Sequence, residues 1–192
     1  SEVYLLLRAG CVLPPEEHTQ LVRQYIAAAD AEKRPRRDNA RVVMTGSFCE
    51  QPPLSLIKSI EMSGCYVVDD EFMLAFRWLM DEVPADGNPL EELSKAFLHR
   101  SAQSSSKYDD RKEDKGKYLL HQVRSRGAEG VIFAAPSFCD PALLERPMLQ
   151  EVLAKQKIPY TAFKYAENTG QMAPIREQAG TFADSIKLWS AA

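Results

Sequence analysis

The stretch Val131–Leu144, with the sequence VIFAAPSFCDPALL, decides the fold that this chain predicts. A short apolar run ends in a loop that contains Pro136 and Pro141, and a helical pattern begins near residue 142. This order of residues is typical of a strand, a turn and a helix. In open parallel sheets, ligands bind beyond the carboxyl ends of the strands. The loop is therefore also a candidate wall of a binding site.

The same strand–loop–helix pattern occurs four times along the chain. We expect strands near residues 41–45, 65–69, 130–134 and 158–164, with helices between them. Short β segments that alternate with helices indicate a parallel sheet with right-handed crossovers. The sequence therefore predicts an α/β fold, a Rossmann-like or flavodoxin-like three-layer domain with a four-stranded parallel sheet in the order 2-1-3-4.

Two segments lie outside this repeated pattern. Residues 1–40 are interpreted as an N-terminal helical segment and linker, and residues 41–192 as the α/β domain. An insertion near residues 81–117 carries a helix near 90–99 and a mobile-looking tract at 101–115. The first residues are strongly apolar and no initiator Met is present. We therefore expect a fragment whose first residues pack against a further domain.

Composition limits the classes of function. The chain has 192 residues, of which 45% are hydrophobic and 27% are charged, as in a soluble globular protein. No apolar run approaches the ~20 residues of a membrane span. The net charge of −3 argues against broad nucleic-acid binding. No export signal is visible, so we expect a cytoplasmic protein with free thiols.

The four cysteines contain no Cys-x-x-Cys pair, which disfavours a zinc knuckle or a self-contained ferredoxin-type cluster. Cys139 stands before a helix, where a thiolate is favoured and can ligate a metal or act as a nucleophile. A lone loop cysteine is more often inert, so both interpretations stay open. We expect Cys65 to be structural, treat Cys49 as a weak candidate, and assign Cys11 no role.

Three other strand ends are polar. Thr45–Ser47 can bind an anion through its backbone N–H groups or form a tight turn, and it is not a Gly-x-Gly-x-x-Gly fingerprint. Asp69–Asp70 favours capping or support of a site over ribose binding. Glu167–Gln171 suits hydrogen bonds to a polar ligand, or a simple Asn/Gly turn. The histidines form no Ser–His–Asp arrangement. The candidate substrate-binding residues are Gly46, Ser47, Asn168 and Gln171.

These segments together resemble a known family. Thr45–Cys49 (TGSFC), Gly64–Asp70 (GCYVVDD) and Ser137–Pro141 (SFCDP) are similar to the benzoyl-CoA reductase / 2-hydroxyacyl-CoA dehydratase family. The ending at Tyr165–Gln171 (YAENTGQ) and Ile175–Phe182 (IREQAGTF) resembles the reductase branch. The dehydratase branch often has a cysteine directly after the Asp-Asp pair, whereas this chain continues with Glu-Phe-Met.

The resemblance implies a 4Fe-4S cluster that is held through three cysteines. Cys139 matches the last of these, and the other two belong to a preceding domain of the family. Cys49 matches a frequent family cysteine that is not taken as a ligand. An isolated chain with one of three ligands is expected to lack the cluster and to be inactive, and solvent is expected to reach its Cys139.

The implied enzyme is an ATP-dependent, iron–sulfur benzoyl-CoA reductase of anaerobic aromatic degradation. Its expected partners are a related substrate-handling subunit, ATP-hydrolysing iron–sulfur activator subunits and an aromatic acyl-CoA thioester, which accepts a low-potential electron. Three alternatives remain: a 2-hydroxyacyl-CoA dehydratase subunit, a non-catalytic Rossmann-like assembly domain, and a flavin or nucleotide binder.

Overall fold

The computed structural model of the chain forms two compact units, Ser1–Asp38 and Asn39–Ala192. It describes residues 1–46, 52–72, 82–100, 112–166 and 172–189. In the segment that follows the second predicted strand, where the alternation of elements predicts a helix, residues 73–81 fall outside them. The helices are α1 (Glu2–Ala9), α2 (Pro15–Ala31), α3 (Leu54–Met62), α4 (Pro89–Lys95), α5 (Lys112–Ser125), α6 (Asp140–Lys155) and α7 (Met172–Trp189), with a π-helical turn η1 (Ala96–Arg100) after α4. The strands are β1 (Ala40–Thr45), β2 (Cys65–Asp70), β3 (Gly130–Pro136) and β4 (Tyr160–Tyr165).

The first unit is a pair of helices, α1 and α2, joined by a short turn. Proline and two acidic residues open α2, and both residue types are favoured in the first turn of a helix. The ring Nε2 of His18 lies 2.9 Å from the carbonyl oxygen of Leu6, and Tyr25 donates to Glu2. Arg34 also bonds Glu2, and this contact holds the pKa of that carboxyl below its ordinary value. Polar contacts therefore connect the two helices.

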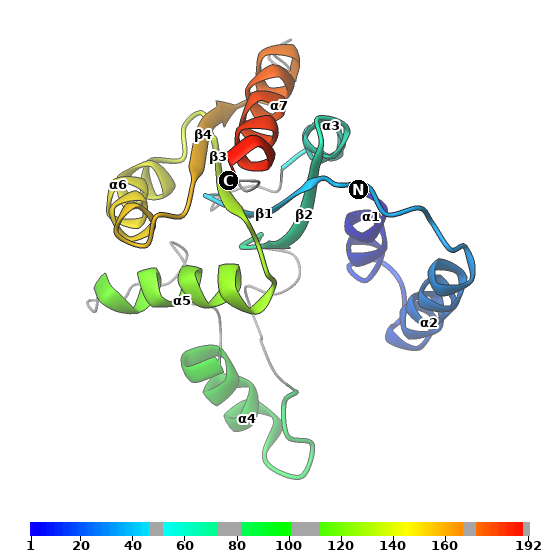
Figure 1. Cartoon of the computed structure of the whole chain (residues 1–192). Coiled ribbons are helices and arrows are strands. Elements are labelled where there is room, and N and C mark those ends of the chain that lie inside the picture. The colour runs from blue at the N-terminus through cyan, green and yellow to red at the C-terminus, as the bar shows by residue number, and fades with distance from the viewer. Residues whose placement is uncertain (47–51, 73–81, 101–111, 167–171, 190–192) are drawn as a thin grey trace. The chain divides into compact units, whose positions relative to one another are not determined.

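The second unit contains a four-stranded sheet in the order β2-β1-β3-β4, with all three pairings parallel. The predicted fold class and strand order are confirmed. Helices α3 and α7 pack together on one face of the sheet, and α5 and α6 pack together on the other (Figure 1). This arrangement is the three-layer architecture expected from the alternation of elements.

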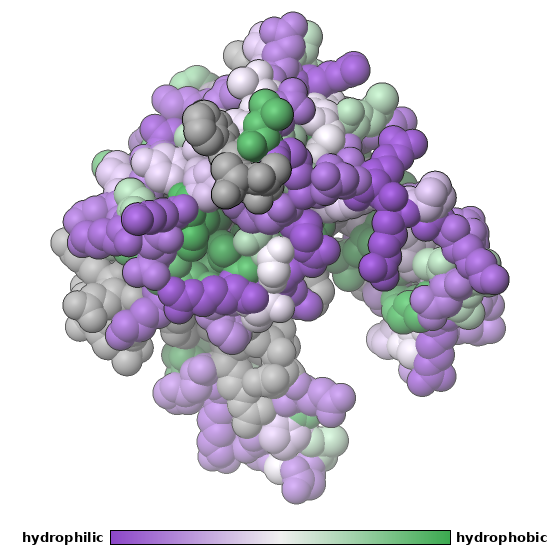
Figure 2. Space-filling model, viewed as in Figure 1, coloured by the Kyte–Doolittle hydropathy of each residue, from purple (hydrophilic) through white to green (hydrophobic). Residues whose placement is uncertain are grey.

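The central strands are buried on both faces, as is typical of parallel sheets. On the α5–α6 side the strand residues Val43, Val131 and Phe133 pack with helix residues in one core cluster. Their neighbours Val42 and Ile132 point to the α3–α7 side, because successive side chains of a strand alternate between faces. The outer surfaces of the helices are mostly hydrophilic, with hydrophobic residues visible between α5 and α6 (Figure 2).

Helix α5 begins earlier than the sequence analysis expects. Residues 112–115, at the end of the tract expected to be mobile, form the first turn of α5, which corrects that expectation. The lysine and glutamate in this turn are good helix formers, so local propensity supports the longer helix. Gly116 sits where α5 approaches α6, and a β-carbon there would lie only 2.8 Å from Val152. The close contact between these helices therefore depends on a glycine.

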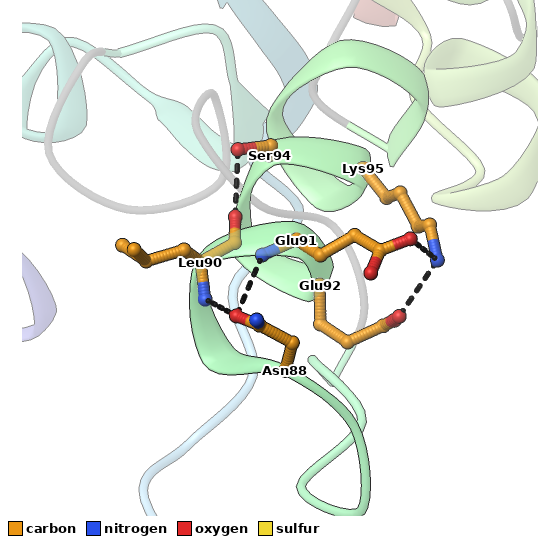
Figure 3. A network of polar contacts seen from close by, with 6 residues as sticks. All are labelled: Asn88, Leu90, Glu91, Glu92, Ser94 and Lys95. Carbon is orange, nitrogen blue, oxygen red and sulfur yellow. Dashed lines mark hydrogen bonds and ion pairs between the residues drawn. The ribbon is translucent and has the colours of Figure 1, made fainter.

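The insertion contains α4 and η1. Asn88 Oδ1 caps α4 by accepting hydrogen bonds from the N–H groups of Leu90 at 3.0 Å and Glu91 at 3.5 Å. Lys95 forms ion pairs of 2.9 Å with Glu91 and Glu92 on the same helix (Figure 3). These local contacts stabilise a short helix. The large apolar side chains of α4 and η1 are exposed: Leu90 and Leu93 on α4, and Phe97 and Leu98 on η1. In the part of the chain that the structure describes, no helix is long and apolar enough to cross a membrane.

Candidate functional site

The carboxyl edge of the sheet contains the point at which the strand order reverses. From β1 the chain passes through α3 to β2, and from β3 it passes through α6 to β4, which lies on the other side. Helices α3 and α6 cover opposite faces of the sheet (Figure 1). The connections after β1 and β3 therefore lead to opposite faces of the sheet. Open α/β sheets bind ligands at such a switch point, and we call the point between the ends of β1 and β3 the crevice.

Gly46 is the first residue of the loop after β1, at this crevice. Its φ of +101° is a conformation that residues with a side chain rarely adopt. A β-carbon at this position would lie 3.3 Å from the carbonyl oxygen of Ala134 on β3. Glycine therefore allows the backbone to leave β1 close against β3. Ser47, the other candidate substrate-binding residue in this loop, lies outside the described residues.

The loop after β3 is joined to the end of β4. The backbone N–H of Ser137 donates to the carbonyl oxygen of Tyr165 at 2.9 Å, and the Ser137 hydroxyl donates to the same oxygen at 3.0 Å. The N–H of Cys139 donates to the carbonyl oxygen of Pro136 at 3.0 Å, which closes a tight turn. Asn168 and Gln171, the candidates after β4, lie outside the described residues.

Cys139 is the N-cap residue of α6, with Pro141 in the first turn of the helix. Its side chain is only 1% exposed and packs with Ala135, Ala142 and Leu143. The expectation that solvent reaches this thiol is therefore wrong. The small alanine side chains leave room for the thiol to turn inward. The neighbouring Phe138 side chain is instead 93% exposed.

The other described cysteines differ from Cys139 in position. Cys65 begins β2, is fully buried, and its thiol lies 3.9 Å from the carbonyl oxygen of Ala179. Burial raises the pKa of the Cys65 thiol from 9.0 to about 11, because the thiolate would lose its solvation. Cys65 therefore behaves as a small core residue at neutral pH. Cys11 is exposed, and Cys49 lies outside the described residues.

The acidic residues at the end of β2 and directly after it bind the surrounding protein. Asp69 accepts a 3.0 Å hydrogen bond from Arg126, and Asp70 accepts one of 2.8 Å from the N–H of Phe72. Glu71 accepts a hydrogen bond from the hydroxyl of Thr45 and is only 6% exposed. Sequence reasoning missed this contact. A threonine that ends an apolar strand, with a glutamate directly after the neighbouring strand, was the available signal.

The described residues do not by themselves fit an iron–sulfur cluster. A 4Fe-4S cluster requires several thiolate ligands close together. Among the ranges that the structure describes, no three His, Cys, Asp or Glu residues form a group that could hold a metal ion. Of the described cysteines, Cys139 alone stands at the carboxyl edge, so they can supply at most one ligand there.

Comparisons with known proteins agree with the resemblance in the motifs. Residues 1–186 match the family model described as 2-hydroxyglutaryl-CoA dehydratase, D-component. The chain is 66% identical over 190 residues to one of the subunits of benzoyl-CoA reductase from Thauera aromatica, covering 99% of this chain and 49% of that protein.

Two dehydratase subunits are more distant relatives. The (R)-phenyllactyl-CoA dehydratase beta subunit of Clostridium sporogenes is 26% identical, over 94% of this chain and 47% of that protein. Lactoyl-CoA dehydratase subunit beta of Anaerotignum propionicum is 24% identical, over 95% of this chain and 48% of that protein. The chain thus spans about half the length of the curated relatives that it matches.

Proposed function

The chain belongs to the 2-hydroxyglutaryl-CoA dehydratase, D-component family, and on this basis we propose that it is part of a substrate-handling subunit of a benzoyl-CoA reductase-like enzyme. The observation that carries the proposal is the 66% identity, along 99% of the chain, to the Thauera aromatica benzoyl-CoA reductase subunit. The reaction is transfer of a low-potential electron to an aromatic acyl-CoA thioester. Its partners are a related substrate-handling subunit and ATP-hydrolysing iron–sulfur activator subunits in an anaerobic cytoplasm.

We place the thioester at the carboxyl edge of the sheet, with Gly46, Ser47, Asn168 and Gln171 as its binding residues. The reversal of strand order between β1 and β3 supports this position. So does Gly46, because its positive φ and its close approach to β3 place the start of the loop after β1 beside the end of β3.

Cys139 contributes one thiolate ligand to a 4Fe-4S cluster in the complete protein. When bound, such a cluster supplies electrons one at a time at low potential. The remaining ligands come from outside the described residues. Because the thiol is 1% exposed, its use as a ligand requires the turn between Pro136 and Cys139 to rearrange.

The second candidate function is that of a 2-hydroxyacyl-CoA dehydratase subunit. It is favoured by the description of the family model and by the two dehydratase relatives, which align with nearly the whole chain. The dehydratase subunit from Clostridium sporogenes is about a quarter identical to this chain, whereas the reductase subunit is two thirds identical. The reductase is therefore the better-supported function.

A turnover assay separates the two functions. The complete protein is assembled with its partner and activator subunits under anaerobic conditions, and benzoyl-CoA or a 2-hydroxyacyl-CoA is added with ATP and a reductant. We expect consumption of benzoyl-CoA that requires ATP. Dehydration of the hydroxyacyl thioester, with benzoyl-CoA unchanged, would identify the protein as a dehydratase instead.

A further inference from the structure

Four buried polar side chains gather where β1 and β2 end. Among the described residues, the polar or charged side chains that are buried are those of Thr45, Asp70, Glu71 and Gln122, each at most 6% exposed. They come from the last residue of β1, the end of β2, the residue after it, and α5. We call these four residues the polar latch.

Hydrogen bonds join the latch across three elements. The hydroxyl of Thr45 donates to Glu71 Oε2, and the backbone N–H of Glu71 donates to the carbonyl oxygen of Met44 at 3.1 Å. From α5, Gln122 Nε2 donates to the carbonyl oxygen of Asp70 at 3.3 Å. Glu71 therefore contacts β1 through both its side chain and its backbone.

The latch lies directly before the crevice. Thr45 precedes Gly46, whose φ of +101° and 3.3 Å approach to Ala134 fix the path of the backbone on the β3 side. The Thr45–Glu71 hydrogen bond fixes the same point on the β2 side. The start of the loop after β1 is thus held from both neighbouring strands.

Stability alone does not account for this choice of residues. Buried polar groups lose their solvation, and their hydrogen bonds return little net free energy. Gln122 Oε1 is buried and has no hydrogen-bond partner among the described residues. A valine at position 45 would have nearly the shape of threonine and would continue the apolar strand. Arrangements that lose stability in this way concentrate at functional sites.

We propose that Glu71 is a positioning residue for acyl-CoA binding, which acts through Thr45 to hold Gly46 in its left-handed conformation at the crevice between β1 and β3. The inference rests on the proposed function and deepens it. Glu71 does not touch the thioester in this account. Loss of the Thr45–Glu71 hydrogen bond releases Gly46 and weakens binding of the thioester, while the fold of the sheet is retained.

The test measures benzoyl-CoA affinity by calorimetry and stability by chemical denaturation on the complete protein with its partner subunits. Thr45→Val removes the hydroxyl, whereas Thr45→Ser keeps it. Glu71→Gln keeps an oxygen that can accept the hydrogen bond. Val131→Ala in the core cluster is the control for a general loss of stability, because Val131 is fully buried near the start of β3, at the end of the strand opposite the carboxyl edge.

We expect Thr45→Val to raise the Kd for benzoyl-CoA roughly tenfold, as for a lost hydrogen bond. Thr45→Ser and Glu71→Gln should stay within about threefold of wild type. Val131→Ala should lose stability with an unchanged Kd. If wild type binds but Thr45→Val binds equally well, or if Val131→Ala weakens binding as much as Thr45→Val, the positioning role is wrong and the proposed function stands.

Two other outcomes are also decisive. If Thr45→Val does not fold, the affinity of Thr45→Ser is compared with that of Glu71→Ala instead. Only Glu71→Ala should then weaken binding. Equal affinities of these two variants would overturn the proposal. If wild type binds no acyl-CoA thioester, the proposed function fails and the positioning role fails with it.

Discussion

The two halves of the carboxyl edge are built in different ways. On the β1–β2 side, buried polar side chains bond one another and the strand ends, as in the pair Thr45 and Glu71. On the β3–α6 side, Cys139 packs among alanines, and its side chain makes no capping hydrogen bond to α6. Both halves contain backbone hydrogen bonds, but the buried side chains of the first half are polar and bond one another, whereas those around Cys139 are small and apolar.

This difference separates two tasks that a site must perform. Hydrogen bonds define the direction of the backbone, so the polar half suits the positioning of a substrate. Small apolar contacts are weak individually and carry no direction. The Cys139 thiol can therefore leave its apolar contacts at a smaller free-energy cost. The proposed role of Cys139 as a metal ligand requires such a release, because the thiol is buried in the structure.

The largest expected effect is that of a substitution at Gly46, whose backbone links the two halves of the carboxyl edge. In Gly46→Val, a β-branched side chain must adopt a positive φ and meet the carbonyl oxygen of Ala134. We expect a loss of roughly 3 kcal/mol in the free energy of unfolding, from strain and overpacking together. Denaturant unfolding measures this loss.

Gly180→Ala is the matched control. Gly180 lies inside α7, and a β-carbon there would meet its nearest neighbour at an ordinary 3.8 Å. The substitution should be neutral or stabilising by up to about 1 kcal/mol, because alanine is the better helix former. An equal loss in both variants would mean that Gly46 occupies no special position.

Thiol labelling sharpens the comparison between buried cysteines. Near pH 8 the exposed Cys11 should react first. Cys139 should follow through local opening of the first turn of α6, at a rate that depends little on low concentrations of denaturant. Cys65 should react last, because its pKa near 11 keeps the thiolate scarce and its exposure requires opening of the sheet.

The pH dependence of Cys65 has a defined sign. The pKa of Cys65 is 9.0 in the unfolded chain and about 11 in the folded one. Its contribution to the free energy of unfolding is therefore fully present below pH 9 and is lost as the pH rises to 11. Cys65 labelling should therefore accelerate steeply in this window, and Cys65→Ala should remove the corresponding loss of stability. Labelling of Cys139 with the same denaturant dependence as Cys65 would contradict the idea that its half of the edge opens locally.

The smallest expected effect concerns the hydrogen bond between the ends of β3 and β4. Ser137→Ala removes the 3.0 Å bond from the hydroxyl to Tyr165 but leaves the 2.9 Å bond from the backbone N–H. We expect a loss of about 1 kcal/mol in unfolding free energy. A loss as large as that of Gly46→Val would show that the β3 side depends on its side-chain hydrogen bond as strongly as the β1 side depends on its backbone geometry.

The sequence predicted the sheet well because its signals are local. Val131–Phe133 and the proline-bearing loop after it identify a buried strand and the start of a helix without any knowledge of the rest of the chain. The strand order follows from general rules for right-handed crossovers. These rules do not depend on which side chains meet.

The site was harder to predict because its contacts are not local. The position of Cys139 before a helix is visible in the sequence, but its burial depends on Ala135 and Ala142 together. Glu71 and Thr45 are 26 residues apart, and only the pairing of β1 with β2 brings them into contact. No short motif encodes such a pair.

The measurement that tests the central claim most directly is the iron and acid-labile sulfide content, with EPR of the reduced state, of the complete protein and two variants. Cys139→Ala removes the proposed ligand, and Cys65→Ala removes an equally buried thiol in the core. We predict that wild type and Cys65→Ala hold a 4Fe-4S cluster and that Cys139→Ala loses most of its iron and the cluster signal. Unchanged iron and an unchanged spectrum in Cys139→Ala would contradict the account, because Cys139 would then be only a small buried residue at the start of a helix.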